Sequence, residues 1–164
     1  MSSAGVSLRL ADRPGDLGWV VERHGTVYAA EYGWDVSFEG LVAEIVAGFA
    51  SGHDPGREAG WIAELEEQRA GSIFCIAADE PGVAALRALF VDPAARRRGI
   101  GRMLIERCIG FARAAGYQQM ELGTTSDLVG ARRLYDAAGF ELVHEERRPR
   151  FGTTVTSQRL ALEL

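Results

Sequence analysis

An apolar run, a turn rich in arginine and glycine, and an amphipathic run follow one another over residues 83–115. The run VAALRALFV at 83–91 is typical of a buried β-strand, and apolar positions between 100 and 115 recur at helical spacing. The turn between them, AARRRGIGRM at 94–103, holds two glycines and four arginines. We therefore expect a strand, a turn and a helix that begins near Gly99 or Gly101.

This unit predicts an anion site. The first amides of a helix lack an intrahelical partner, and the helix dipole adds partial positive charge at the same end. Glycine at 99 and 101 lets an anion approach the backbone, while the arginines supply charge. A pyrophosphate suits such a site. A solvated arginine run at an ordinary helix start is the alternative interpretation of these residues alone.

Patterns elsewhere predict the remaining elements of one α/β domain over residues 1–164, with a mixed sheet. We expect the helix from Asp16 to Gly33 to be interrupted at Gly25, and the next helix to be capped by Ser37. The turn 66–69 and the run EERRPR at 145–150 are interpreted as solvated loops. The other expected strands cover 6–11, 61–65, 72–78, 119–124, 140–144 and 155–162, and a further helix covers 128–138.

Composition narrows the classes of function. A net charge of -5 argues against a broad nucleic-acid-binding face. No apolar run could span a bilayer and no signal peptide is evident, so we expect a cytoplasmic protein without a membrane partner. Cys75 and Cys108 lie in apolar segments and are expected to be reduced core residues. The histidines have no metal-ligand spacing, so no metal is expected; they are His24, His53 and His144.

Two segments, 86–116 and 120–143, together resemble the GNAT superfamily of acetyl-CoA-dependent N-acyltransferases and cover about half of the chain. Arg96, Gly99 and Gly101 match the family pattern of arginine or glutamine, two residues, glycine, one residue, then glycine or alanine. The second segment matches at Ala131, Leu134, Tyr135, Gly139 and Phe140. Residues 15–46 also resemble the acetyltransferase domain often fused to MarR-type DNA-binding regulators. No winged-helix sequence precedes them, so a stand-alone version is expected.

The resemblance implies a GNAT-like mixed, mostly antiparallel central sheet with splayed fourth and fifth strands, flanked by helices. It also implies acetyl-CoA as co-substrate. The pantetheine arm would pair with backbone near Leu89 and Val91, and the pyrophosphate would lie on the amides of residues 97–102. The cofactor-binding residues expected on this basis are Leu89, Val91, Arg96, Arg97, Arg98, Gly99, Ile100, Gly101, Arg102 and Tyr135.

The same resemblance suggests catalytic roles. Tyr135 occupies the family's position for the proton donor to the departing thiolate, although a tyrosine at helical spacing could also be plain core. A backbone N–H near Val91 would polarise the acetyl carbonyl. Relatives carry a glutamate that acts as general base at one of two positions, and these positions hold Ala85 and Gly123 here. Glu121 projects to the same side as Gly123 and is our candidate base, directly or through water.

The acceptor side is expected on the first two helices. Aromatic residues and a carboxylate there could line a pocket for an amine, but aromatic residues at helical spacing are as often core. The acidic balance of the whole chain slightly favours a cationic acceptor. The candidate substrate residues are Trp19, His24, Tyr28, Glu31 and Tyr32, with Trp34 beside them.

The leading hypothesis is an N-acetyltransferase that moves acetyl to a primary amine of a small molecule, an amino acid or a peptide, by direct attack in a ternary complex. The alternative is a non-catalytic acyl-CoA-binding regulatory module. Nucleic-acid binding through residues 96–98 is a third possibility, which predicts salt-sensitive DNA affinity. Relatives often dimerise, but no uninterrupted apolar patch here requires a homodimer.

Overall fold

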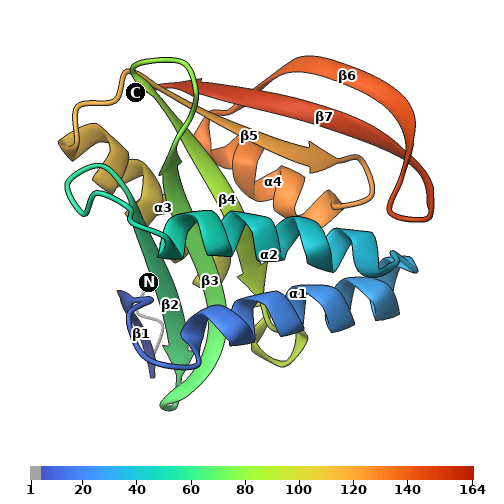
Figure 1. The fold of residues 1–164 in the computed structure, drawn as a ribbon, viewed down its shortest axis with the longest axis horizontal. Helices are drawn as coiled ribbons and strands as arrows, with labels where there is room; N and C mark the ends of the chain where they lie inside the picture. Colours follow the sequence, from blue (N-terminus) through green and yellow to red (C-terminus); the bar gives the residue numbers. More distant parts are fainter. Residues whose placement is uncertain (1–4) are drawn as a thin grey trace.

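One seven-stranded sheet organises the protein, whose computed structural model describes residues 5–164 (Figure 1). The strand order is β1-β2-β3-β4-β5-β7-β6, and every neighbouring pair is antiparallel except β4 and β5. The predicted mixed, mostly antiparallel sheet is therefore confirmed. The strands are β1 (Val6–Leu10), β2 (Ala59–Leu65), β3 (Gln68–Ala77), β4 (Val83–Val91), β5 (Gln119–Thr125), β6 (Glu141–Arg150) and β7 (Thr153–Glu163).

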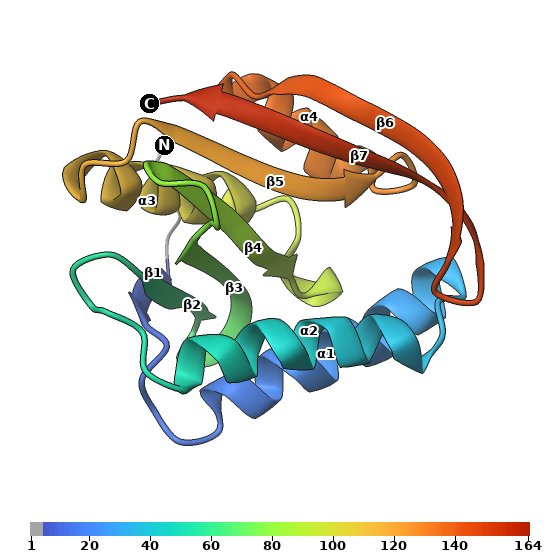
Figure 2. The same ribbon diagram turned by 45° about the horizontal axis from the view of Figure 1, so that its top comes forward.

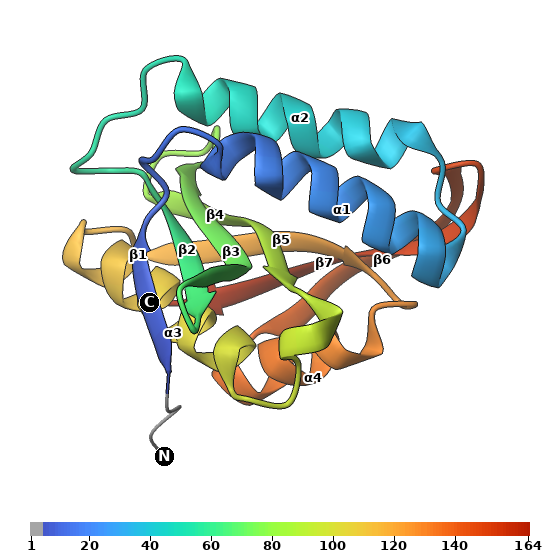
Figure 3. The same cartoon turned by 90° about the horizontal axis from the view of Figure 1, so that it is seen from below.

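Helices cover both faces of the sheet. The pair α1 (Asp16–Tyr32) and α2 (Val36–Ala50) lies on one face, and α3 (Ile100–Ala114) and α4 (Val129–Ala138) lie on the other (Figure 3). A short 3₁₀ helix, Pro93–Ala95, joins β4 to α3. Each face has its own buried apolar cluster, with Leu104 and Met120 on the α3 side and Val42 and Phe74 on the α2 side. Burial of both faces explains the apolar character of the central strands.

The parallel strands β4 and β5 separate after a short paired stretch. Their pairs run only from Val83 with Gln119 to Ala85 with Glu121, although β4 continues to Val91. Figure 2 shows the two strands diverging beyond this point. The predicted splay is confirmed, and it leaves the far half of β4 without a partner on its β5 side.

A β-bulge lies in this unpaired part of β4. Ala88 and Leu89 together face the single residue Ile73 of β3, and Ala88 adopts the left-handed conformation with a φ of 51°. The Ser72 hydroxyl donates to the Ala88 carbonyl at 2.9 Å. Such a conformation is disfavoured for a residue with a β-carbon, and bulges often redirect side chains beside functional sites.

Two expectations about the first helices are wrong. Asp35, not Ser37, caps α2, since its carboxylate accepts from the Ser37 amide at 3.0 Å and from the Ser37 hydroxyl. Gly25 does not interrupt α1. The helix is continuous from Asp16 to Tyr32, and a β-carbon at Gly25 would lie 2.1 Å from Glu39 Oε1 of α2, so a larger residue there would displace the Glu39 side chain.

The segment EERRPR is also not a loop, because it forms the second half of β6. The strand lies at the sheet edge and is exposed on both faces, so it lacks the alternation that identifies a half-buried strand. Phe151 and Gly152, with φ of 58° and 79°, form the two-residue turn to β7. The Phe151 carbonyl accepts from the Asp35 amide at 3.0 Å, which fixes the hairpin against the α1–α2 connection.

Residues 68–69 were also expected in a loop, but they form the start of β3.

The cysteine prediction is confirmed, because Cys75 and Cys108 are both free and buried. Within residues 5–164, no helix is long and apolar enough to cross a membrane.

A buried ion cluster holds the start of α1 to the sheet. Asp16 has no exposed surface, and its carboxylate accepts from Arg9 at 2.7 and 2.9 Å, from Arg69 at 2.9 Å and from the Arg13 amide at 2.9 Å. Burial alone would raise the pKa of Asp16, but the hydrogen bonds, first that from Arg9, outweigh it and lower the pKa to about 2.

Replacing Asp16 by asparagine is expected to lower the free energy of unfolding by about 3 kcal/mol near neutral pH, because the half-buried Arg9 and Arg69 lose their buried counter-charge. Because the pKa of Asp16 is lower in the folded than in the unfolded protein, ionised Asp16 stabilises the fold. This stabilisation is complete above the unfolded pKa of about 4 and is lost as pH falls through about 2. The difference between variant and wild type should therefore shrink by about 1 kcal/mol at pH 3. Urea unfolding at both pH values measures this. The exposed Asp79 provides the control, Asp79→Asn, and an equal effect there would contradict the account.

Candidate functional site

Two adjoining cavities lie along the unpaired part of β4. One, of about 430 Å³, reaches the start of α3, and we call it the helix-end cavity. The other, of about 350 Å³, lies between α2, β4, β5 and the β6–β7 hairpin, and we call it the inner cavity. The two share Leu89 of β4 and three further lining residues, namely Tyr28, Leu128 and Ala131.

Most of the predicted cofactor residues line the helix-end cavity. Arg98 is outside its lining, and Tyr135 lines the inner cavity instead. The structure thus brings together Leu89, Val91, Arg96, Arg97, Gly99, Ile100, Gly101 and Arg102.

The start of α3 presents backbone amides to the helix-end cavity. Gly99 caps the helix in the left-handed conformation with a φ of 77°, and Arg97 is also left-handed at 65°. The first intrahelical bond runs from the Met103 amide to the Gly99 carbonyl at 3.0 Å, so the preceding amides lack intrahelical acceptors. A β-carbon at Gly101 would lie 2.7 Å from Leu134 Cδ1 of α4. This end therefore suits an anion held by backbone N–H groups.

Arg96 is held in place by a carboxylate of α1. Its guanidinium donates to Glu31 through Nη1 at 2.8 Å and Nη2 at 2.5 Å, a fork-like pairing. The hydrogen bond from Arg96 lowers the pKa of Glu31. Glu31 was expected on the acceptor side, but it lines neither cavity, because its carboxylate is engaged at the arginine turn.

The open edge of β4 carries unpaired backbone groups. The Asp92 amide donates to the Ala70 carbonyl of β3 at 2.7 Å. Because alternate residues of a strand direct their backbone groups to opposite edges, those of Val91 and Leu89 point away from β3, toward the splay. An extended ligand could pair with the strand at this edge.

Tyr135 of α4 is 5% exposed, and its ring meets the edge of Phe140 at a centroid distance of 5.8 Å. Burial raises the pKa of Tyr135 above its ordinary value of 10, and the nearby Tyr28 phenol adds to this. The phenol therefore remains protonated at neutral and mildly alkaline pH, as a proton donor requires.

His24 of α1 also lines the inner cavity. Its Nδ1 lies 2.7 Å from the Val20 carbonyl, which can only accept, so Nδ1 carries the proton. Burial lowers the pKa of His24 to about 4, so the ring is neutral at pH 7. The free lone pair is then on Nε2, which is buried and has no hydrogen-bond partner.

Unpartnered polar atoms gather at the inner cavity. Within residues 5–164, five buried side-chain nitrogen or oxygen atoms have no hydrogen-bond partner, and the residues of all five line this cavity. Such atoms are costly unless a ligand or water satisfies them. They are His24 Nε2, Trp34 Nε1, Thr124 Oγ1, Thr125 Oγ1 and Ser157 Oγ.

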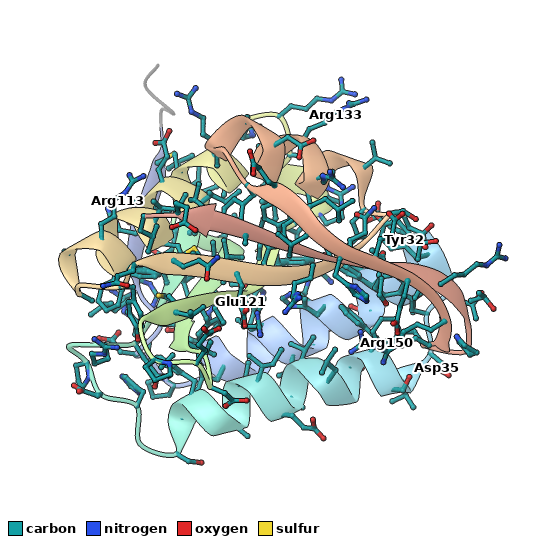
Figure 4. All side chains as sticks on the ribbon, turned by 90° about the horizontal axis from the view of Figure 1, so that it is seen from above. Tyr32, Asp35, Arg113, Glu121, Arg133 and Arg150 are labelled. Atoms are coloured by element: carbon teal, nitrogen blue, oxygen red, sulfur yellow. The ribbon has the colours of Figure 1, made fainter. Side chains whose placement is uncertain are left out.

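The charged side chains that line the inner cavity are those of Arg87 and Arg150. Sequence reasoning assigned no role to either residue. Arg150 lies at the end of β6, close to Asp35 in the view of Figure 4, whereas Glu121 lies further along β5. Gly152, just after Arg150 and Phe151, is the sequence signal that could have indicated a hairpin, since hairpin turns favour glycine where φ is positive.

Other predicted residues are divided between the cavities and the core. His24, Tyr28 and Trp34 line the inner cavity, and Tyr32 lines the helix-end cavity. Trp19 lines neither, because it packs edge-on against Phe90 at 5.8 Å. Glu121 also lines neither cavity. It lies opposite Ala85 in the paired part of the sheet, where its charge opposes the effect of burial on the pKa of Arg87.

Comparisons with known proteins agree with this arrangement. The model of the acetyltransferase (GNAT) family matches residues 9–140. Human N-acetyltransferase 8 is 35% identical over 85 residues, which cover 49% of this chain and 37% of that protein. N-acetylaspartate synthetase from Danio rerio is 34% identical over 85 residues, which cover 52% of this chain and 30% of that protein. The chain thus spans about a third of the length of these curated relatives.

Among solved structures, the acetyltransferase yncA from Salmonella typhimurium, solved with acetyl-CoA, superposes with a TM-score of 0.78. It is 20% identical, and the match covers 98% of this chain and 94% of that one. This likeness establishes the fold.

Proposed function

The chain belongs to the acetyltransferase (GNAT) family, and we propose that it transfers acetyl from acetyl-CoA to a primary amine by direct attack in a ternary complex. The observation that carries this proposal is the meeting of two cavities at Leu89 on the open edge of β4. One cavity ends at cationic side chains and helix amides, and the other contains a buried phenol. A donor and an acceptor could therefore meet at one point from opposite sides.

Acetyl-CoA fits the helix-end cavity by its chemistry. Its diphosphate would accept hydrogen bonds from the amides at the start of α3, with Arg97 and Arg102 supplying charge. Its pantetheine arm would lie along β4 and pair with Leu89 and Val91. The thioester would then reach the junction with the inner cavity.

The transfer step needs an attacking lone pair, a polarised carbonyl and a protonated leaving group. The amine nitrogen would bond to the acetyl carbon while an unpaired amide of β4 donates to the carbonyl oxygen. As the carbon–sulfur bond breaks, Tyr135 would give its proton to the thiolate. The amine nitrogen loses one proton to a base, and Tyr135 regains one from solvent, so atoms and charge balance over the cycle.

Glu121 is the proposed acceptor of that proton, and its position outside both cavity linings requires a water molecule as relay. Glu121→Gln should then lower kcat/KM for the amine about tenfold at neutral pH, with the loss recovered at alkaline pH. The KM for acetyl-CoA should be unchanged. A pH profile of kcat/KM for the amine tests this. An unaltered profile would remove Glu121 from the mechanism and leave the minor neutral fraction of the amine as the reactant.

The transferase proposal itself is tested by thiol release from acetyl-CoA in the presence of a panel of primary amines, with mass spectrometry of the products. We expect thiol release that depends on the amine and an N-acetylated product. Tight acetyl-CoA binding without turnover of any amine would instead support a non-catalytic acyl-CoA-binding module.

A further inference from the structure

We propose that the amine acceptor is a small molecule that carries a carboxylate and an apolar side chain, and that Arg87 and Arg150 bind its carboxylate. This rests on the proposed transfer function and names the substrate class of the same site. Three features of the inner cavity support it: the two arginines in its lining, the buried polar atoms without hydrogen-bond partners, and its apolar wall.

Arg87 is a cation without a counter-ion. It lies on β4 two residues before Leu89, and its Nη1 donates to the Leu86 carbonyl at 3.1 Å. Among residues 5–164 it forms no ion pair. Burial lowers the pKa of Arg87, and the charge of Glu121 opposes this only from a distance. An unpaired charge away from water is destabilising, so a bound carboxylate would remove a cost already present.

Arg150 supplies a second cation from another element. It ends β6, and its guanidinium carbon lies 4.7 Å from the centre of the Phe151 ring. It too lacks an ion pair in the described chain, and burial lowers its pKa, with a further contribution from Arg148. Arginine suits this role because its planar fork matches a carboxylate.

Among the described residues 5–164, no aspartate or glutamate lines the inner cavity, although the protein as a whole carries a net charge of -5. The charged side chains of the lining are therefore positive, and this disfavours a cationic acceptor, in contrast to the expectation drawn from overall charge. A positive surrounding also lowers the pKa of a bound amine. This enlarges the neutral fraction that can attack the thioester.

The remaining walls define the rest of the acceptor. One side is apolar and comes from α2, through Phe38, Leu41, Val42 and Ile45. The hydroxyls of Thr124, Thr125 and Ser157 lack partners and could complete the hydrogen bonding of a carboxylate. A volume of about 350 Å³ suits a small ligand. Together these features fit an amino acid with an uncharged apolar side chain.

Matched pairs of acceptors test the inference: leucine with leucinamide, methionine with methioninamide, and phenylalanine with phenylalaninamide. Each pair replaces the carboxylate by a carboxamide of similar size. Because this change also lowers the pKa of the α-amine, kcat/KM is compared for the neutral form of each amine. We expect wild-type kcat/KM to favour the best acid over its amide by about 100-fold, the effect of a lost charged hydrogen-bond partner. In Arg87→Met this preference should nearly vanish. Arg133→Met is the matched control, since Arg133 projects outward from α4 in Figure 4, and it should keep the preference.

Two additions keep the test decisive. Arg150→Met should also reduce the preference, and Arg87→Lys should retain part of it, which separates a binding role from a folding defect. Calorimetry of the N-acetyl derivatives of the same pairs with the CoA-loaded protein measures the site without turnover.

Equal kcat/KM for acids and amides would overturn the carboxylate inference and leave the transferase proposal intact. Arg87-dependent binding of an N-acetyl amino acid without turnover of any amine would support the inference and overturn the transferase. Binding of none of the N-acetyl acids, with no acid acetylated, would overturn the inference.

Discussion

Replacing Tyr135 by phenylalanine is expected to lower kcat by about 100-fold while KM for acetyl-CoA stays within about twofold. The ring would keep its edge contact with Phe140, so the change removes the hydroxyl and little packing. Steady-state kinetics with both substrates varied measures the separation. Because burial raises the pKa of Tyr135, the wild-type rate should also show no alkaline loss near pH 10.

Tyr117→Phe is the matched control for this variant. Tyr117 donates its hydroxyl to the Arg57 carbonyl at 2.8 Å and lines neither cavity. Loss of the Tyr117 hydroxyl should leave kcat unchanged. A Tyr135→Phe enzyme with the wild-type kcat would exclude Tyr135 as the proton donor, and water would have to take that role.

The double variant Gly99→Val and Gly101→Val is expected to weaken acetyl-CoA binding by about 100-fold or more, since at least two charged hydrogen bonds would be lost. Valine at Gly99 would be strained by about 1–2 kcal/mol at a φ of 77°. A side chain at Gly101 would press against Leu134, which also lines the helix-end cavity. Isothermal titration calorimetry with acetyl-CoA measures the affinity.

Gly110→Val provides the control for helix propensity. Gly110 also lies in α3, and a β-carbon there would meet nothing within 4 Å. This variant should bind acetyl-CoA as the wild type does, and thermal melts would verify that all variants fold. Undiminished affinity in the double variant would show that the diphosphate does not lie at this helix start.

The fold was predictable where local pattern and burial coincide. The run from Val83 to Val91 and the helix from Ile100 are apolar on the faces that the sheet and α3 bury, so their periodicity located them. The first half of the edge strand β6 was predicted, but its second half was missed, because that half is exposed on both faces and its pairing with β7 leaves no apolar pattern. The cap of α2 was misplaced by two residues because Asp35 and Ser37 are both good N-caps.

The candidate site divides in the same way. The helix-end cavity is built largely from one continuous segment around Gly99, so a local motif was enough to predict its lining. The inner cavity combines α1, α2, β4, β5, α4 and the β6–β7 hairpin, and no local pattern links Arg87 to Arg150. The register of β4 on β3 and the fold of the hairpin against the α1–α2 connection bring these side chains to one cavity.

Initial rates at several fixed concentrations of acetyl-CoA and of a carboxylate-bearing amine test the central claim most directly. Direct attack with both substrates bound predicts double-reciprocal lines that intersect, with the rate falling to background when either substrate is omitted. Parallel lines would indicate an acetylated enzyme intermediate, and no amine-dependent rate would indicate a binding module; either result would contradict a transfer between the two cavities.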